Sequence, residues 1–257
     1  MGTSSSFKGK VGNALLPNDF NSDDDMLDEN ISNEDYKDDD KNTTENSINW
    51  TTAKTSMSKY ISSSGKVGSP KSIVRNYIKA SGGSSRLISN LSNSRTAASK
   101  IGNILIRFTT QGIGKTLDDI GLSLQNRSLP EAMSRLVNYV HDSAVSKNDV
   151  AIRTATANTF EKLIELKVDD DRVDQSTAMV LMQYFMAELL WQQMLIDFGY
   201  SFEKYGNDLN MLIKVEEEMK EYIKANVEEA FRRNKDKIFL QDMYEDIMKT
   251  CLEIMEE

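Results

Sequence analysis

The stretch from residue 174 to residue 198 places the strongest limit on how this chain folds. Apolar side chains occur on almost every helical face of this stretch: Met179, Val180, Leu181, Met182, Tyr184, Phe185, Met186, Leu189, Leu190, Trp191, Met194, Leu195 and Ile196. A helix that is apolar all round needs neighbours on every side. Glu188, Gln192 and Gln193 interrupt the run, and such groups are costly in hydrocarbon. We therefore predict a buried helix at the centre of a helical bundle, and no membrane span.

Other stretches of the C-terminal half show the same helical spacing of apolar residues. Pro130, Asp149, Asp174 and Asp208 stand near plausible helix starts. No run of any length alternates with the period of a β-strand, and no solenoid repeat is evident. The predicted fold is all-α, with helices at residues 130–145, 149–167, 174–198, 208–233 and 238–256.

Helical spacing also begins near Trp50. Met57, Tyr60 and Ile61 share one face, and Pro70 can occupy the first turn of a helix that Gly82-Gly83 ends. Two more apolar patterns follow this glycine pair. One contains Leu87, Ile88 and Leu91, and the other contains Ile101, Ile104, Leu105 and Phe108.

Charge is segregated along the chain, although the net charge of the 257 residues is −9. Twelve acidic residues but only two lysines lie within residues 17–49, which predicts a disordered acidic linker because apolar residues there are few. Residues 50–115 hold eleven Lys and Arg and no acidic residue. The predicted organisation is an N-terminal glycine-motif peptide (1–16), the linker (17–49), a basic serine-rich helical module (50–116) and an acidic helical bundle (117–257).

The basic segment is a candidate binding surface. Lysines and arginines without acidic neighbours can contact phosphates with a salt-dependent affinity, so nucleic-acid binding is one hypothesis. Few aromatic residues accompany these bases, which makes base stacking weak. Docking of the acidic linker or of an acidic partner is the rival explanation. The residues that would form this patch are Arg75, Lys79, Arg86, Arg95, Lys100 and Arg107.

No motif within the chain predicts an active site, a metal site or a cofactor. Gly112-Ile113-Gly114-Lys115-Thr116 resembles half of a phosphate-binding loop, but Thr109 stands where the first glycine is required, so a glycine turn between helices is the better interpretation. His141 is the only histidine and Cys251 the only cysteine, too few ligands for a zinc site. The run Asp169-Asp170-Asp171 lacks the alternating ligands and glycine of a calcium loop. We expect a protein that is not an enzyme.

The first six residues, Met1-Gly2-Thr3-Ser4-Ser5-Ser6, are a candidate chemical handle. A small second residue permits removal of Met1, which leaves an unhindered glycine amine on a polar tail. These residues also match the short myristoylation pattern, but one acyl chain binds membranes only marginally. With a single cysteine and no apolar signal segment, the expected location is the cytoplasm, without membrane association.

The first six residues, the element Gly68-Ser69-Pro70 through Arg75, Tyr77 and Gly82-Gly83, and the helical C-terminal half together resemble the QatB family of the bacterial Qat anti-phage defence system. Family members often continue the N-terminal motif with a Gly-Gly-Pro-like turn, where this chain has Phe7-Lys8-Gly9-Lys10. The resemblance implies three partners: the ATPase QatA, the QueC-like protein QatC and the TatD-like nuclease QatD.

The same resemblance implies that QatC engages the N-terminus, with Gly2, Thr3, Ser4, Ser5 and Ser6 as the contact residues. An enzyme that activates a carboxylate with ATP transfers it to an amine, and an α-amine has a reference pKa of about 7.7 to 8.0 against about 10.4 for lysine. Our hypothesis is that Gly2 accepts a deazaguanine-type group. A nucleic-acid-binding adaptor that uses residues 50–115, or a scaffold that only holds partners, remains the alternative.

Overall fold

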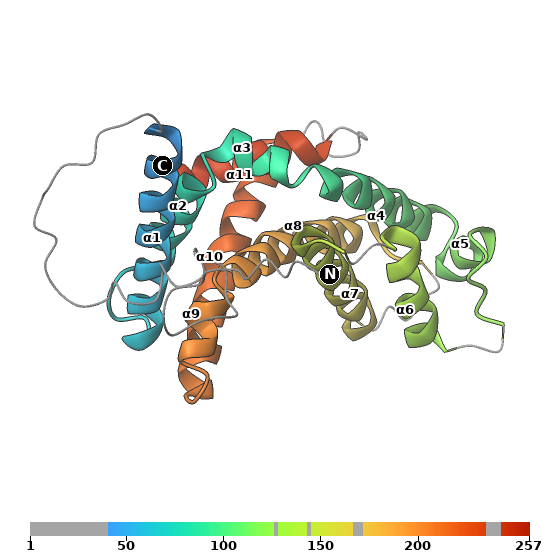
Figure 1. The fold of residues 1–257 in the computed structure, drawn as a ribbon. Coiled ribbons are helices and arrows are strands. Elements are labelled where there is room, and N and C mark those ends of the chain that lie inside the picture. The colour runs from blue at the N-terminus through green and yellow to red at the C-terminus, as the bar shows by residue number, and fades with distance from the viewer. Residues whose placement is uncertain (1–40, 126–127, 143–144, 167–171, 235–242) are drawn as a thin grey trace, which may run out of the picture. The chain divides into compact units, whose positions relative to one another are not determined.

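The computed structural model describes residues 41–125, 128–142, 145–166, 172–234 and 243–257 (Figure 1). Every regular element in these ranges is a helix, which confirms the predicted all-α class. The glycine-motif peptide (1–16) and most of the predicted acidic linker lie outside the described residues. The helices are α1 (Lys41–Ser62), α2 (Pro70–Ala80), α3 (Ser84–Asn90), α4 (Ser92–Thr110), α5 (Ile113–Asp119), α6 (Leu129–Val140), α7 (Lys147–Glu165), α8 (Gln175–Asp197), α9 (Gly199–Lys204), α10 (Leu209–Arg233) and α11 (Met243–Glu256).

Helix α8 is the central element, as predicted. It packs against α7, α10, α4 and α9, and Leu181, Phe185 and Leu189 are completely buried (Figure 1). Asp174 begins the helix, because its carboxylate accepts a hydrogen bond of 2.8 Å from the Thr177 amide. In the described ranges, none of the helices combines the length and apolar content that crossing a bilayer requires.

The helices of residues 50–116 and 117–257 belong to one compact unit, which extends from Lys41 to Glu257. Helices α1 and α2 pack against each other and against α10, while α4 packs against α7 and α8. The basic and acidic ranges that we separated in the sequence are therefore interleaved in space. The amphipathic helices α1, α2, α3 and α4 of the first range bury apolar surface against helices of the second as well as against one another.

Helix α1 begins at Lys41, within the range 17–49 for which we predict a linker. Among the residues of α1 whose burial is described, Ala53, Met57, Tyr60 and Ile61 are buried. Once packing holds these turns in place, adding a residue to an existing helix costs much less than nucleating a new one. The helix can therefore continue toward the N-terminus through polar residues that carry no apolar pattern.

The start and end of α2 follow the predicted signals. Ser69 and Ser72 exchange hydrogen bonds as a capping box, and Pro70 follows the cap directly. Gly82 and Gly83 adopt φ values of 89° and 87°, which a residue with a Cβ rarely adopts. A Cβ on Gly82 would also lie 2.5 Å from Cδ of Arg86. This glycine therefore both ends the helical segment and leaves room for the arginine.

Helix α6 ends at Val140, whereas the apolar pattern predicts helix to residue 145. His141 has an extended conformation, and its carbonyl accepts a hydrogen bond of 2.6 Å from Nη1 of Arg153 on α7. This tertiary contact replaces the helical partner of that carbonyl. The short helices α5 and α9 were not predicted, since six or seven residues carry too little periodicity.

Replacement of Phe185 by alanine tests the central position of α8. Phe185 is fully buried, so loss of its ring and the cavity left behind should lower the free energy of unfolding by about 3–5 kcal/mol. Urea denaturation of both proteins measures this difference. The matched control is Val180→Ala on the same helix, where the side chain is 49% exposed and the change should stay within about 0.5 kcal/mol. Equal effects of the two replacements would contradict the assignment.

Candidate functional sites

The predicted contact residues Gly2, Thr3, Ser4, Ser5 and Ser6 lie outside the described residues. The six residues of the predicted basic patch are all described, and the structure divides them into two groups. Arg75 and Lys79 on α2 and Arg86 on α3 are exposed, and none of them forms an ion pair with a described residue. We call these three residues the free basic group.

The other three residues of the predicted patch make contacts within the chain. Arg95 pairs with Glu245 of α11 at 2.9 Å, and Arg107 pairs with Asp119 of α5 at 2.5 Å. Lys100 donates hydrogen bonds of 3.1 Å to the carbonyls of Tyr139 and Val140. These carbonyls end helix α6, where the helix dipole favours a cation. The structure thus does not bring all six residues together as one free surface.

Gly112 forms the turn between two helices that we predicted, whereas Gly114 lies within α5. Gly112 has a φ of 94° and separates α4 from α5. The hydroxyl of Thr116 donates a hydrogen bond of 2.6 Å to the carbonyl of Gly112. A phosphate-binding loop requires a strand before the glycines, and here the preceding element is α4.

The only histidine has a structural position. Nε2 of His141 lies 3.0 Å from Oδ1 of Asp149, and the His141 side chain is 15% exposed. Asp149 also exchanges hydrogen bonds with Ser146 in the capping box of α7. This group therefore holds the end of α6 to the start of α7. Within the described ranges, no three His, Cys, Asp or Glu side chains gather as a metal ion would require, and Asp169-Asp170-Asp171 lies outside those ranges.

A buried carboxylate on α8 ties three helices together. Glu188 accepts a hydrogen bond of 2.8 Å from Nδ2 of Asn158 on α7, and it lies 3.4 Å from Nζ of Lys220 on α10. Burial lowers the pKa of Lys220, but the hydrogen bond to Glu216 and the charge of Glu188 outweigh it, so that the pKa is raised. A paired buried charge of this kind positions helices more than it stabilises them.

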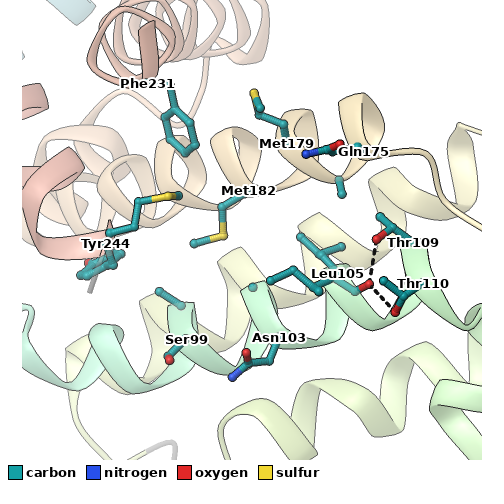
Figure 2. A pocket seen from close by; sticks show the side chains of 15 residues that line it. Ser99, Asn103, Leu105, Thr109, Thr110, Gln175, Met179, Met182, Phe231 and Tyr244 are labelled. Atoms are coloured by element: carbon teal, nitrogen blue, oxygen red, sulfur yellow. Dashed lines mark hydrogen bonds between the residues drawn. The ribbon is translucent and has the colours of Figure 1, made fainter. Parts of the chain in front are cut away.

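One apolar cavity opens between α4 and α8, with a volume of about 490 Å³ (Figure 2). Met179 and Met182 of α8 line it opposite Leu105 of α4, and Phe231 and Tyr244 close one end. The hydroxyls of nearby threonines at positions 109 and 110 donate to the carbonyl of residue 106 at 2.7 and 3.0 Å. These polar groups are thereby satisfied by the backbone. We had assigned the methionines of α8 to the core, and the sequence carries no signal for a cavity here.

A second cavity is polar and has a volume of about 360 Å³. Its wall includes Asp197, which accepts hydrogen bonds from the hydroxyl of Tyr77 at 2.9 Å and from Nε2 of Gln193 at 3.1 Å. Sequence analysis missed this cavity, because its residues come from five helices and no pattern within one helix joins them. It is lined by Trp50, Tyr77, Ala80, Ser81, Arg86, Leu87, Asn90, Leu91, Lys147, Asn148, Gln193 and Asp197.

The single cysteine belongs to the core. Cys251 is fully buried on α11, and burial raises the pKa of its thiol to about 12. The thiolate is the reactive form, so almost none is present near neutral pH.

We predict that Cys251 of the folded protein reacts with iodoacetamide at pH 8 at least about 100-fold more slowly than in the unfolded chain. Mass spectrometry of labelled samples with and without urea measures both rates. Equal labelling of the native and unfolded protein would show that the thiol is accessible.

A comparison with protein-family models finds one match, described as Qat anti-phage system associated protein QatB, over residues 82–255. Neither curated proteins nor solved structures give a significant match. The matched range covers more than half of the chain and runs from the glycine pair after α2 into α11. The chain is therefore an all-α protein associated with an anti-phage defence system. It belongs to the QatB family, as the resemblance in its sequence indicates.

Proposed function

We propose that this protein is a non-catalytic subunit of a cytoplasmic Qat defence complex, and that it presents Gly2 to the QueC-like protein QatC as the acceptor of a deazaguanine-type group. The main support for this proposal is that the chain belongs to the QatB family. The sequence Met1-Gly2-Thr3-Ser4-Ser5-Ser6 supplies the acceptor, since removal of Met1 leaves a free α-amine. Near neutral pH a substantial fraction of an α-amine is deprotonated and nucleophilic, unlike a lysine side chain.

The order of the chain supports this division of roles. Gly2 precedes the start of α1 by 39 residues, which span at most about 130 Å when fully extended. A tail of this length can enter the cleft of a partner while the helical unit is bound elsewhere. In this proposal the helices from α1 onward anchor the complex with QatC, QatA and QatD, and Gly2 is the residue that is acted upon.

Intact mass spectrometry of the chain co-expressed with QatC tests the acceptor role. The expected result is loss of Met1 and a mass increase that fragmentation places on Gly2. Gly2→Glu should abolish this mass increase. Met1 is not removed before a large second residue, so this variant has no N-terminal glycine amine. Gly12→Glu, in the same N-terminal segment, is the matched control and should keep the modification.

An unmodified Gly2 under conditions in which the system protects cells would overturn the acceptor role. Removal of residues 1–10 separates this role from that of a scaffold. If the truncated chain still assembles with its partners but protection is lost, the N-terminus is required for function. If both assembly and protection persist, the helical unit acts as a scaffold alone.

A second function, binding of nucleic acid, is favoured by the free basic group. Arg75, Lys79 and Arg86 stand exposed without an ion pair to any described residue, and such cations can contact phosphates. The other cations of the predicted patch contribute less, because Arg95 and Arg107 already pair with carboxylates of the chain.

Reversal of the charge of the free basic group tests nucleic-acid binding. The triple variant Arg75→Glu, Lys79→Glu and Arg86→Glu should weaken binding to a DNA duplex at least tenfold and reduce the slope of log K against log salt by about 3. Fluorescence anisotropy at several salt concentrations measures both quantities.

The matched control makes the same change of charge elsewhere, with Lys204→Glu, Lys224→Glu and Lys249→Glu at exposed positions. This control should retain more of the affinity than the triple variant. Absence of any binding to DNA or RNA at low salt would remove nucleic-acid binding as a function of this protein.

A further inference from the structure

The polar cavity has the size and surroundings of a small-molecule site. Its volume of about 360 Å³ lies within the range of roughly 300–1,000 Å³ that is typical of ligand pockets. Five helices contribute to its wall: α1, α2, α3, α7 and α8. The side chain of Asn148 on α7 donates a hydrogen bond of 2.6 Å to the carbonyl of Asn90, which holds two parts of the wall together.

One part of the wall is formed by the carboxylate of Asp197, beside the buried amide of Gln193. Nε2 of Gln193 donates to Oδ2 of Asp197, and this contact sets the orientation of the amide. Oε1 of Gln193 is then buried without a partner in the described part of the chain, and only 6% of this residue is exposed. Oδ2 of Asp197 also accepts from Tyr77, whereas no described donor faces Oδ1. A ligand that fits here brings adjacent N–H donors.

Another part of the wall is cationic. Arg86 and Lys147 both line the cavity, and neither forms an ion pair with a described residue. Lys147 and Asn148 are also the first two residues of the 19-residue helix α7. The side chain of Ser146 caps the amide of Asp149, and no side chain of the described residues caps the amides of Lys147 and Asn148. Free amides at a helix start and two cations together favour a phosphate.

Aromatic surface completes the site. Trp50 is partly buried and packs edge-on against Tyr77, with ring centroids 5.8 Å apart. Both residues line the cavity, but Tyr77 is only 2% exposed, so Trp50 supplies the accessible aromatic surface. Aromatic surface of this kind suits a planar heterocycle.

We propose that this cavity binds a guanine mononucleotide. The N1–H and N2–H donors of guanine face the carboxylate of Asp197, and the phosphate lies against Arg86, Lys147 and the first amides of α7. Adenine fits less well, because its N1 is an acceptor and would face a carboxylate. This binding site is independent of Gly2 and of the transfer reaction proposed above.

Isothermal titration of the full-length chain with GMP and with AMP tests the proposal. GMP is expected to bind, and AMP to bind at least tenfold more weakly. Lys147→Glu, at the exposed start of α7, should weaken GMP binding at least tenfold. Lys224→Glu makes the same charge change on α10, away from the cavity, and should leave GMP binding unchanged.

Asp197→Asn tests the recognition of the base. Asparagine keeps an acceptor for Tyr77 but adds donors, so the preference for GMP over AMP should fall at least fivefold. Circular dichroism confirms that this variant is folded, and Lys147→Glu provides a test at the surface if it is not. Absence of heat with millimolar GMP, equal binding of AMP, or undiminished binding by Lys147→Glu would overturn the proposal.

Discussion

The need to bury α8 on every side is the constraint on which the rest of the fold depends. Leu189, Leu190 and Trp191 are consecutive residues that point to different sides of this helix, and each of them is buried. One neighbouring helix covers only one stripe of such a surface, so several must surround it. Helices α4 and α7 cover part of α8, and α9 and α10 cover other parts. The same arrangement brings distant parts of the chain together, since α4 and α10 are separated by about a hundred residues.

Burial of α8 also accounts for the polar groups at its surface. Glu188 is buried because its position on an all-round apolar helix cannot reach water, and it is satisfied by Asn158 of α7 and Lys220 of α10. Farther along the helix, Asp197 is joined to Tyr77 of α2. The two carboxylates thus connect α8 to helices from both halves of the chain. Gln193 and Asp197 of the same helix also line the polar cavity.

The folded chain changes the meaning of the charge segregation. In sequence, eleven bases stand in residues 50–115 without an acid, and the excess of acids lies on either side. Packing brings Glu245 of α11 to Arg95 and the end of α6 to Lys100. Part of the basic segment is therefore engaged by the C-terminal half of its own chain. The free basic group of α2 and α3 keeps its charge available for a partner.

Local signals predicted several elements well. The apolar period located α8 and α10 to within a residue or two, and Ser69, Pro70 and the glycine pair defined α2. These features depend on residues a few positions apart, which the sequence shows directly. The end of α6 was placed too late because the contact of Arg153 with the carbonyl of His141 is a tertiary one. The short helices α5 and α9 had too few residues for a period to be visible.

The sequence by itself determined the all-α class, the central helix and the resemblance that the family match confirms. It also contains the N-terminal glycine on which the proposed function depends. Only the tertiary structure decided which bases remain free and where cavities form. The physical reason is that ion pairs such as Arg95–Glu245 and the walls of a cavity join residues far apart in the chain. Their meeting depends on how the helices pack around α8, and no local pattern encodes it.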